Sequence, residues 1–149
     1  LHPVAVRTGQ LLHPLADRIV MIFGGMNVAR QIYLDGRKHS GALSFMGHAV
    51  GRWDGDTLVV DTDDLRGGNE VWLDYLGTPK TDALHVVERI RRPSHDVLEI
   101  DFTFEDPGAF TRPWEGKKRF YLMPAESEHY EYTVCETPKA LGGRGAYSF

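Results

Sequence analysis

The clearest pattern in the chain is a pair of short apolar runs between Gly47 and Thr62 that flank a tight turn. Asp54-Gly55 is a turn signal, because glycine supplies the positive φ that a two-residue type I′ connection requires. Apolar residues fall on both faces of these runs, so we expect two antiparallel strands that are covered on both sides or curled into a barrel. This hairpin predicts the architecture of the chain and leaves its chemistry open.

Period-two alternation predicts further short strands on either side of the hairpin. The clearest is Val97 to Glu105, in which Leu, Ile and Phe alternate with acidic residues and threonine, so that one face is expected in the core and the other in solvent. Asp35-Gly36 is interpreted as a second turn of the same kind as Asp54-Gly55. The other expected strands cover residues 18–23, 29–34, 83–91, 117–123 and 129–135, with a shorter extended piece at 70–76.

These elements predict an all-β fold with a single domain over residues 1–149. We expect an antiparallel β-barrel of the lipocalin-like, up-and-down type, because a closed barrel has no exposed sheet edge. A two-sheet β-sandwich is the alternative. Two His-Pro pairs indicate an irregular N-terminal arm at 1–16, Gly and Pro residues indicate a long loop or lid at 63–82, and three glycines indicate a flexible tail at 137–149.

Composition narrows the classes of partner. An apolar fraction of 42% and a charged fraction of 26% are ordinary for a soluble globular protein. A net charge of −4 provides no basic surface, so we expect neither nucleic acid nor a membrane as a partner. Cys135 is the single cysteine, which excludes an internal disulfide and a cysteine-based zinc cluster.

Four segments carry a resemblance to known proteins. They are RQIYLDGRKH (residues 30–39), GRWDGDTLVVDT (51–62), ALHVVERIRR (83–92) and FEDPGAFTRPW (104–114). In this order they resemble a functionally unassigned family of small, mostly exported bacterial β-rich proteins. The resemblance implies a compact β-rich domain in the periplasm or outside the cell, with a signal peptide that the given sequence does not include. It implies no activity, and the continuation Thr137-Pro138-Lys139 departs from the family's usual Asn-containing run.

Two histidines are the leading candidates for catalysis. If His48 and His85 point into one barrel cavity, with Tyr33 or Asp35 nearby, they can move protons on a bound organic molecule. Histidine titrates near neutrality, and a carboxylate or phenol beside it orients it or acts as the second acid-base group. We therefore predict a small-molecule enzyme of lyase or isomerase type that needs no cofactor. The alternative for each histidine is a surface or structural role.

Arginine and tryptophan residues are the candidates for substrate binding. Arg52 or Arg89 is expected to bind an anionic group of the substrate, since guanidinium binds carboxylates and phosphates bidentately. Trp53 and Trp72 are expected to supply apolar contact area. Structural salt bridges with neighbouring carboxylates are the alternative for the arginines.

Two other functions stay open. His39, His48 and His85 could form a three-histidine metal site for zinc or iron, with Glu88 or Asp35 as a carboxylate ligand, although no HxH or HExxH pair supports it. A non-catalytic, lipocalin-like binding protein would instead hold an apolar small molecule, or the tryptophans would form a homo-oligomer interface. Nucleotide cofactors lack a motif, because the chain has neither GxGxxG nor a Walker loop.

Overall fold

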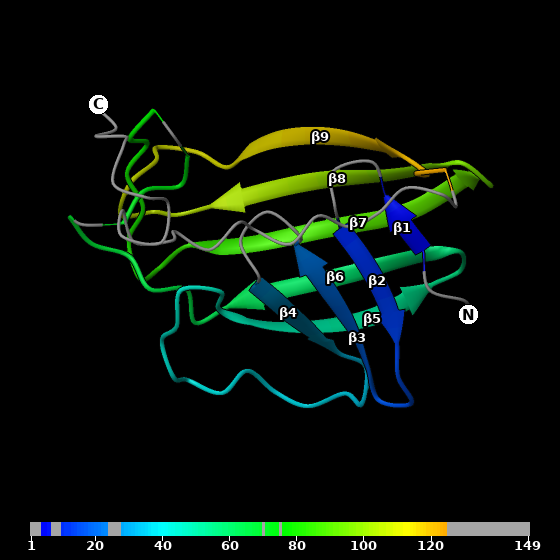
Figure 1. Cartoon of the computed structure of the whole chain (residues 1–149). Helices are drawn as coiled ribbons and strands as arrows, with labels where there is room; N and C mark the ends of the chain where they lie inside the picture. The colour runs from blue at the N-terminus through cyan, green and yellow to red at the C-terminus, as the bar shows by residue number, and fades with distance from the viewer. Residues whose placement is uncertain (1–3, 7–9, 24–27, 70, 75, 125–149) are drawn as a thin grey trace, which may run out of the picture.

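The computed structural model of the chain describes residues 4–6, 10–23, 28–69, 71–74 and 76–124. Within these ranges it contains strands and no helix, and so no helix that is long and apolar enough to cross a membrane. The all-β prediction is confirmed. The strands are β1 (Val4–Val6), β2 (Gln10–Pro14), β3 (Arg18–Phe23), β4 (Val28–Tyr33), β5 (His48–Asp54), β6 (Thr57–Asp63), β7 (His85–Ser94), β8 (Val97–Glu105) and β9 (Trp114–Tyr121) (Figure 1).

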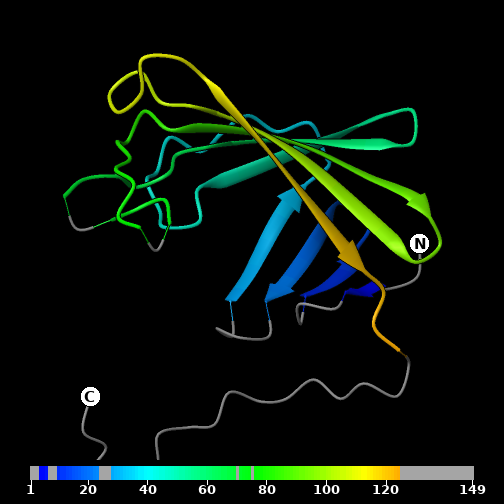
Figure 2. The ribbon, with the colours of Figure 1, turned by 90° about the horizontal axis from the view of Figure 1, so that it is seen from above.

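All nine strands belong to one sheet in the order of the sequence, and the sheet curls into a half-barrel. Strands β1 to β4 cross the longer strands β5 to β9 at a steep angle (Figures 1 and 2). In the described residues β1 and β9 end the strand order, so this part of the chain shows neither the closed barrel that we expected nor the alternative of two packed sheets. Every neighbouring pair is antiparallel except β4 and β5, which are parallel, and the expected up-and-down pattern is wrong there.

The central hairpin of β5 and β6 is confirmed, with one change at its turn. Asp54 pairs with Thr57, so the two loop residues are Gly55 and Asp56. Gly55 has φ +58°, and among the described residues Asp64 is the one non-glycine residue with a positive φ. Glycine at the first loop position followed by a negative φ is the type II′ turn, and not type I′. Gly36 also has a positive φ, but it begins a long connection instead of a hairpin.

Several other predicted elements differ from the structure. The expected irregular arm at 1–16 contains β1 and β2, because these residues extend the sheet beside β3. Within the described part of 70–76, an isolated bridge between Trp72 and Pro79 replaces the expected extended piece. Strand β9 begins at Trp114, three positions before the predicted start. The expected strand at 129–135 and the tail at 137–149 lie outside the described residues.

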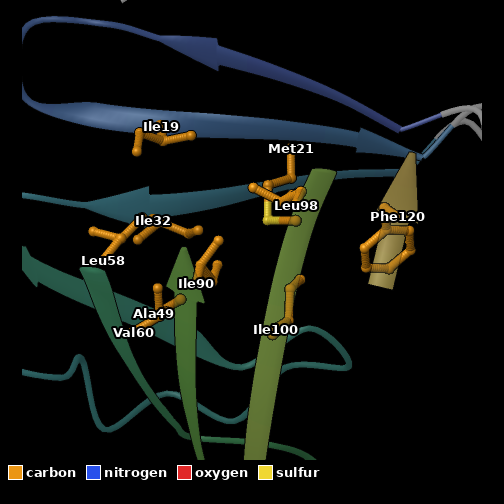
Figure 3. Packing of buried hydrophobic residues seen from close by; sticks show 10 residues of the cluster. All are labelled: Ile19, Met21, Ile32, Ala49, Leu58, Val60, Ile90, Leu98, Ile100 and Phe120. Carbon is orange, nitrogen blue, oxygen red and sulfur yellow. The ribbon is translucent and has the colours of Figure 1, made fainter. Parts of the chain in front are cut away.

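The hydrophobic core lies between β3–β4 and the crossing strands β5 to β9 (Figure 3). Alternate residues of each strand face it, as Ile32 of β4 and Val60 of β6 do, and both are fully buried. We call this side of the sheet the inner face and the other side the outer face. The core cluster consists of Ile19, Met21, Ile32, Ala49, Leu58, Val60, Ile90, Leu98, Ile100 and Phe120.

A buried ion pair also lies on the inner face. Arg30 of β4 donates through both terminal nitrogens to the Glu88 carboxylate of β7, one of them at 3.0 Å. Its Nη2 also donates to Thr62 Oγ1 at 2.7 Å. The side chains of Arg30 and Glu88 are only 12% and 5% exposed, so each charge depends on the other for compensation. Because β4 and β7 are not neighbours, this pair ties the two halves of the half-barrel together.

We predict that removing one partner of this pair destabilises the protein more than removing both. Glu88→Leu leaves the Arg30 charge buried and is expected to cost about 3 to 5 kcal/mol of unfolding free energy. The double variant Arg30→Met with Glu88→Leu is expected to recover at least half of that loss, because no unpaired charge remains. Urea unfolding of the variants measures both effects, and a double variant less stable than either single variant would contradict the assignment.

Asp106 attaches the start of β7 to the end of β8. Its side chain is almost fully buried, and its carboxylate accepts hydrogen bonds from Thr81 N and Thr81 Oγ1, each at 2.6 Å, and from Gly108 N at 3.1 Å. Burial alone would raise the pKa of Asp106, but the hydrogen bonds from Thr81 and Gly108 outweigh it and lower the pKa. The carboxylate is therefore ionised at neutral pH and holds the connection after β6 against the sheet.

We predict that Asp106→Asn lowers the unfolding free energy by about 2 kcal/mol at neutral pH, since it weakens charged hydrogen bonds. A folded-state pKa below the unfolded value of about 3.9 stabilises the fold above that value, and this stabilisation is lost as the pH falls through the lowered pKa. The difference between the wild type and the variant should therefore shrink below about pH 4. Asp96→Asn, in the exposed β7–β8 turn, is the control and should change stability by less than about 0.5 kcal/mol.

Candidate functional site

Polar residues from four neighbouring strands meet on the outer face of the sheet. Tyr33 of β4 and Asp61 of β6 both have Val50 of β5 as their cross-strand partner, so the three share one face. His48 lies two positions before Val50, and His85 of β7 lies two positions before the partner of Asp61. Alternation therefore places both histidines on that face. The site is thus opposite the core, and not inside a barrel cavity as expected.

The connection between β4 and β5, residues 34–47, brings His39 to this group. Asp64, which follows β6 with φ +60°, holds the connection in place: its carboxylate accepts hydrogen bonds from Ser40 Oγ at 2.9 Å and from Gly41 N at 2.8 Å. Burial alone would raise the pKa of Asp64, but the bonds from Ser40 and Gly41 and the nearby His39 lower it. The Asp64 carboxylate thus holds residues 40 and 41 of the connection, and Asp64 itself adopts a left-handed conformation that is uncommon for a residue other than glycine.

Asp61 is the centre of the cluster. Its Oδ1 lies 3.0 Å from Nε2 of His39 and 3.0 Å from Nε2 of His85. The other ring nitrogen of His39, Nδ1, lies 3.0 Å from the carbonyl oxygen of His48. Both ring nitrogens of His39 thus face oxygen atoms, one from Asp61 and one from the His48 main chain.

His48 completes the cluster from the side of β5. Its ring stacks on Tyr33 with the ring centres 5.1 Å apart, and it meets the His39 ring edge-on at 5.7 Å. Its Nδ1 is buried, and no described residue hydrogen-bonds it. A ring nitrogen of His39, one of His48 and a carboxylate oxygen of Asp64 all lie within 4.8 Å of one another. Within the described part of the chain, these three residues are therefore the ones that could hold a metal ion.

Two predicted catalytic residues, His48 and His85, thus join the same cluster, and Tyr33 lies beside it. Asp35 instead pairs with Arg37, whose hydrogen bonds lower the pKa of Asp35 to about 2. The Arg37 guanidinium lies 3.8 Å above the Tyr33 ring, so Asp35 acts on the site only through Arg37.

The predicted anion-binding residues lie at the other end of the outer face. Arg52 and Arg89 are each four positions along their strands from His48 and His85, which is about 13 Å. Arg89 donates to Asp54 at 3.0 Å, which matches the structural salt-bridge alternative. Trp53 is half exposed at the same hairpin end. The binding roles of Arg52, Arg89 and Trp53 stay predictions. Any ligand bound there would lie at the hairpin end of the sheet and not beside the histidines.

Trp72 lines a separate hollow of about 570 Å³ between the connection after β6 and the turn after β8. Lys80 lines the same hollow, although its side chain is nearly buried, and burial lowers its pKa against the opposing effect of Asp106. The other lining residues are Gly68, Asn69, Gly77, Pro79, Thr81, Asp82, Gly108 and Ala109. The later residues of the expected loop or lid at 63–82 therefore border a hollow, while Asp64 near its start belongs to the cluster of histidines.

The sequence interpretation missed Asp61 and Asp64 and named His39 only as a metal alternative. A signal for Asp61 was present: counting pairs outward from the β5–β6 turn places it opposite Val50, diagonal to His48. Asp64 gave no such signal, because its role depends on the left-handed backbone and on a connection whose path the sequence does not reveal.

We predict that Gly47→Ala disturbs this site, because Gly47 has φ +65° and an added Cβ would lie 2.6 Å from the Asp63 carbonyl oxygen. The expected loss is about 2 to 4 kcal/mol of unfolding free energy, with shifted NMR signals of His39 and His48. Gly36→Ala is the matched control: its φ is +74° but the Cβ would meet nothing within 4 Å, so only the backbone cost of about 1 kcal/mol applies. Equal losses in the two variants would refute close packing at Gly47.

Comparisons with known proteins give no assignment: no family model, no curated protein and no solved structure matches this chain. The resemblance to a functionally unassigned exported family therefore stays a prediction. What the protein does has to follow from the geometry of its outer face.

Proposed function

We propose that the protein is an enzyme that transfers protons on a small organic molecule, of isomerase or lyase type, and that His85 is its general base. The observation that carries this proposal is the position of Asp61, whose Oδ1 lies 3.0 Å from both His39 and His85. A carboxylate held against one ring nitrogen orients a histidine and stabilises the imidazolium that forms when the other nitrogen takes a proton.

His85 is a member of the cluster that a ligand can reach. Its side chain is 34% exposed, and that of Asp61 is 48% exposed. Nε2 of His85 faces Asp61, and no described residue hydrogen-bonds its Nδ1. In the proposed step, Nδ1 of His85 removes a proton from a carbon atom next to a carbonyl group and returns it to a neighbouring atom of the same molecule, which is isomerisation. Loss of a leaving group from the intermediate instead gives the lyase reaction.

The remaining residues of the cluster fix the base. His39 supplies a second hydrogen bond to Asp61, which prevents the carboxylate from rotating away from His85. The Tyr33 and His48 rings stack on each other beside this group and supply an aromatic surface for a small planar molecule. We propose export from the cytoplasm as the setting of this activity, on the basis of the resemblance alone.

The carrier alternative lacks a comparable observation. An apolar ligand would occupy the inner face, where Ile32 and Val60 are completely buried by neighbouring side chains. A polar cluster on the outer face has no use in such a carrier, so the catalytic proposal is preferred.

The proposal predicts that the protein exchanges carbon-bound hydrogen with solvent. Pools of small carbonyl compounds are incubated with the full chain in D₂O, and deuterium incorporation is followed by NMR. At least one compound should exchange, and His85→Gln and Asp61→Asn should slow that exchange by about 100-fold or more, the usual contribution of a general base. Both variants should keep the wild-type unfolding free energy to within about 1 to 2 kcal/mol, since neither creates a large cavity.

His95→Gln is the matched control, because His95 also contacts a neighbouring aspartate but lies in the exposed β7–β8 turn. It should leave the exchange rate unchanged. Exchange that is equally fast in the wild type and in His85→Gln would rule out His85 as the base, and an absence of exchange across all pools would count against proton transfer from carbon.

A further inference from the structure

We propose that His39, His48 and Asp64 bind one zinc ion beside the proposed base. This inference rests on the proposed function for its place in catalysis, but the site itself is argued from geometry alone. The three residues come from the connection at 34–47, from the start of β5 and from the end of β6, and their ligand atoms lie within 4.8 Å of one another. Two imidazoles and one carboxylate, with a fourth position left for water, form a common catalytic zinc site.

His48 provides the first feature that supports a metal ion here. Its Nδ1 is buried, and no described residue hydrogen-bonds it, although buried polar atoms in folded proteins nearly always have a partner. Tyr33 stacked on the ring holds this nitrogen in place. A metal ion bound to the Nδ1 lone pair supplies the missing partner.

His39 provides the second feature. Its Nε2 lies 3.0 Å from Asp61 Oδ1, and a metal-binding histidine commonly donates its other ring nitrogen to a carboxylate in this way. That bond leaves Nδ1 as the ligand atom, which then exchanges its contact with the His48 carbonyl oxygen for the metal. Asp61 is therefore a positioning residue for the metal as well as for His85.

Asp64 provides the third feature that supports a metal ion. Oδ2 of its carboxylate accepts the bonds from Ser40 and Gly41, so the side chain is fixed while Oδ1 remains for a ligand. Its φ of +60° is an unfavourable backbone conformation for an aspartate, and such positions cluster at ligand sites. One residue thus closes the connection over the outer face and offers a zinc ligand.

The inference assigns zinc a place next to His85 without using His85 as a ligand. Zinc would lower the pKa of a bound water or polarise a substrate carbonyl, which makes the neighbouring carbon-bound proton easier to remove. The earlier expectation of a three-histidine metal site is replaced by a site with two histidines and one aspartate.

The test is metal binding by the full chain after treatment with EDTA and dialysis. Isothermal titration with ZnCl₂ is expected to show one zinc per chain, and Co²⁺ in its place should give the intense visible absorption of a four-coordinate site. His39→Gln and His48→Gln should each weaken zinc binding by more than about 100-fold, beyond the effect of removing an outer-shell partner. Asp61→Asn should weaken it by about 10- to 100-fold.

Two controls separate metal binding from folding. Ser40→Ala removes a hydrogen-bond partner of Asp64 but no ligand, and it should weaken zinc binding by about 10- to 100-fold, less than the loss of a ligand histidine does. His95→Gln should bind as the wild type does. An EDTA-treated protein that takes up no zinc, or binding that survives both His39→Gln and His48→Gln, would overturn the inference.

These outcomes are independent of the proposed function. Zinc uptake is measured without substrate, while proton exchange is measured with and without EDTA. Exchange that persists in the metal-free protein, together with no zinc uptake, would retain His85 as the base and reject the zinc site. Zinc uptake with no exchange in any pool would retain the zinc site and reject His85 as the base.

Discussion

The parallel pairing of β4 and β5 is the constraint on which the site depends. A parallel pair cannot be joined by a tight turn, because the chain has to return to the starting end of the sheet before the second strand begins. Residues 34–47 make this return across the outer face, and they carry His39 to Asp61. The same pairing puts Tyr33 beside His48. An antiparallel hairpin at this point would have brought none of these contacts.

Both faces of the sheet bring acidic and basic side chains together, but with different exposure to solvent. On the inner face the Arg30 and Glu88 charges are buried and hydrogen-bonded to each other, so they connect β4 to β7 and are closed to a ligand. On the outer face Asp61 also contacts two basic side chains, but all three remain partly exposed. Burial, and not residue type, separates the structural ion pair from the candidate site.

The sequence predicted the strands well where alternation was strong. The two faces of β7 and β8 follow from period two alone, and so does the separation of His85 from Glu88. The acidic face of β8 is not all in solvent as expected, because Arg91 and Arg119 pair with Glu99 and bury it. The half-barrel could not be predicted in the same way, because strand order across β4 and β5 depends on a connection with little periodicity. For the same reason Asp35-Gly36 looked like a hairpin turn, although Gly36 only begins the return of the chain.

The sequence singled out His48, His85 and Tyr33, which the structure brings close together, but it missed Asp61 within β6 and Asp64 after it, and the catalytic roles stay predictions. His48, His85 and Tyr33 could be recognised because chemistry and face are both readable along a strand. For the two arginines the structure shows only that Arg89 pairs with Asp54 of the neighbouring hairpin, so their role in anion binding stays a prediction. The role of Asp64 is recognised only from the structure, in its left-handed backbone and its bonds to Ser40 and Gly41.

The position of Asp64 explains why a polar cluster persists on an open sheet face. Exposed ion pairs contribute little to stability, so a sheet surface has no thermodynamic need to gather histidines from separate segments. Here the histidines are brought together by the connection at 34–47, which Asp64 holds through Ser40 and Gly41. Asp64 adopts a left-handed backbone conformation to do so, which costs conformational energy. The other end of the same face carries ordinary ion pairs such as Arg89–Asp54 and, among the described residues, no non-glycine residue in such a conformation. This contrast favours a ligand-binding role for the cluster around Asp64. The local strain and the cluster of histidines are therefore two aspects of one site.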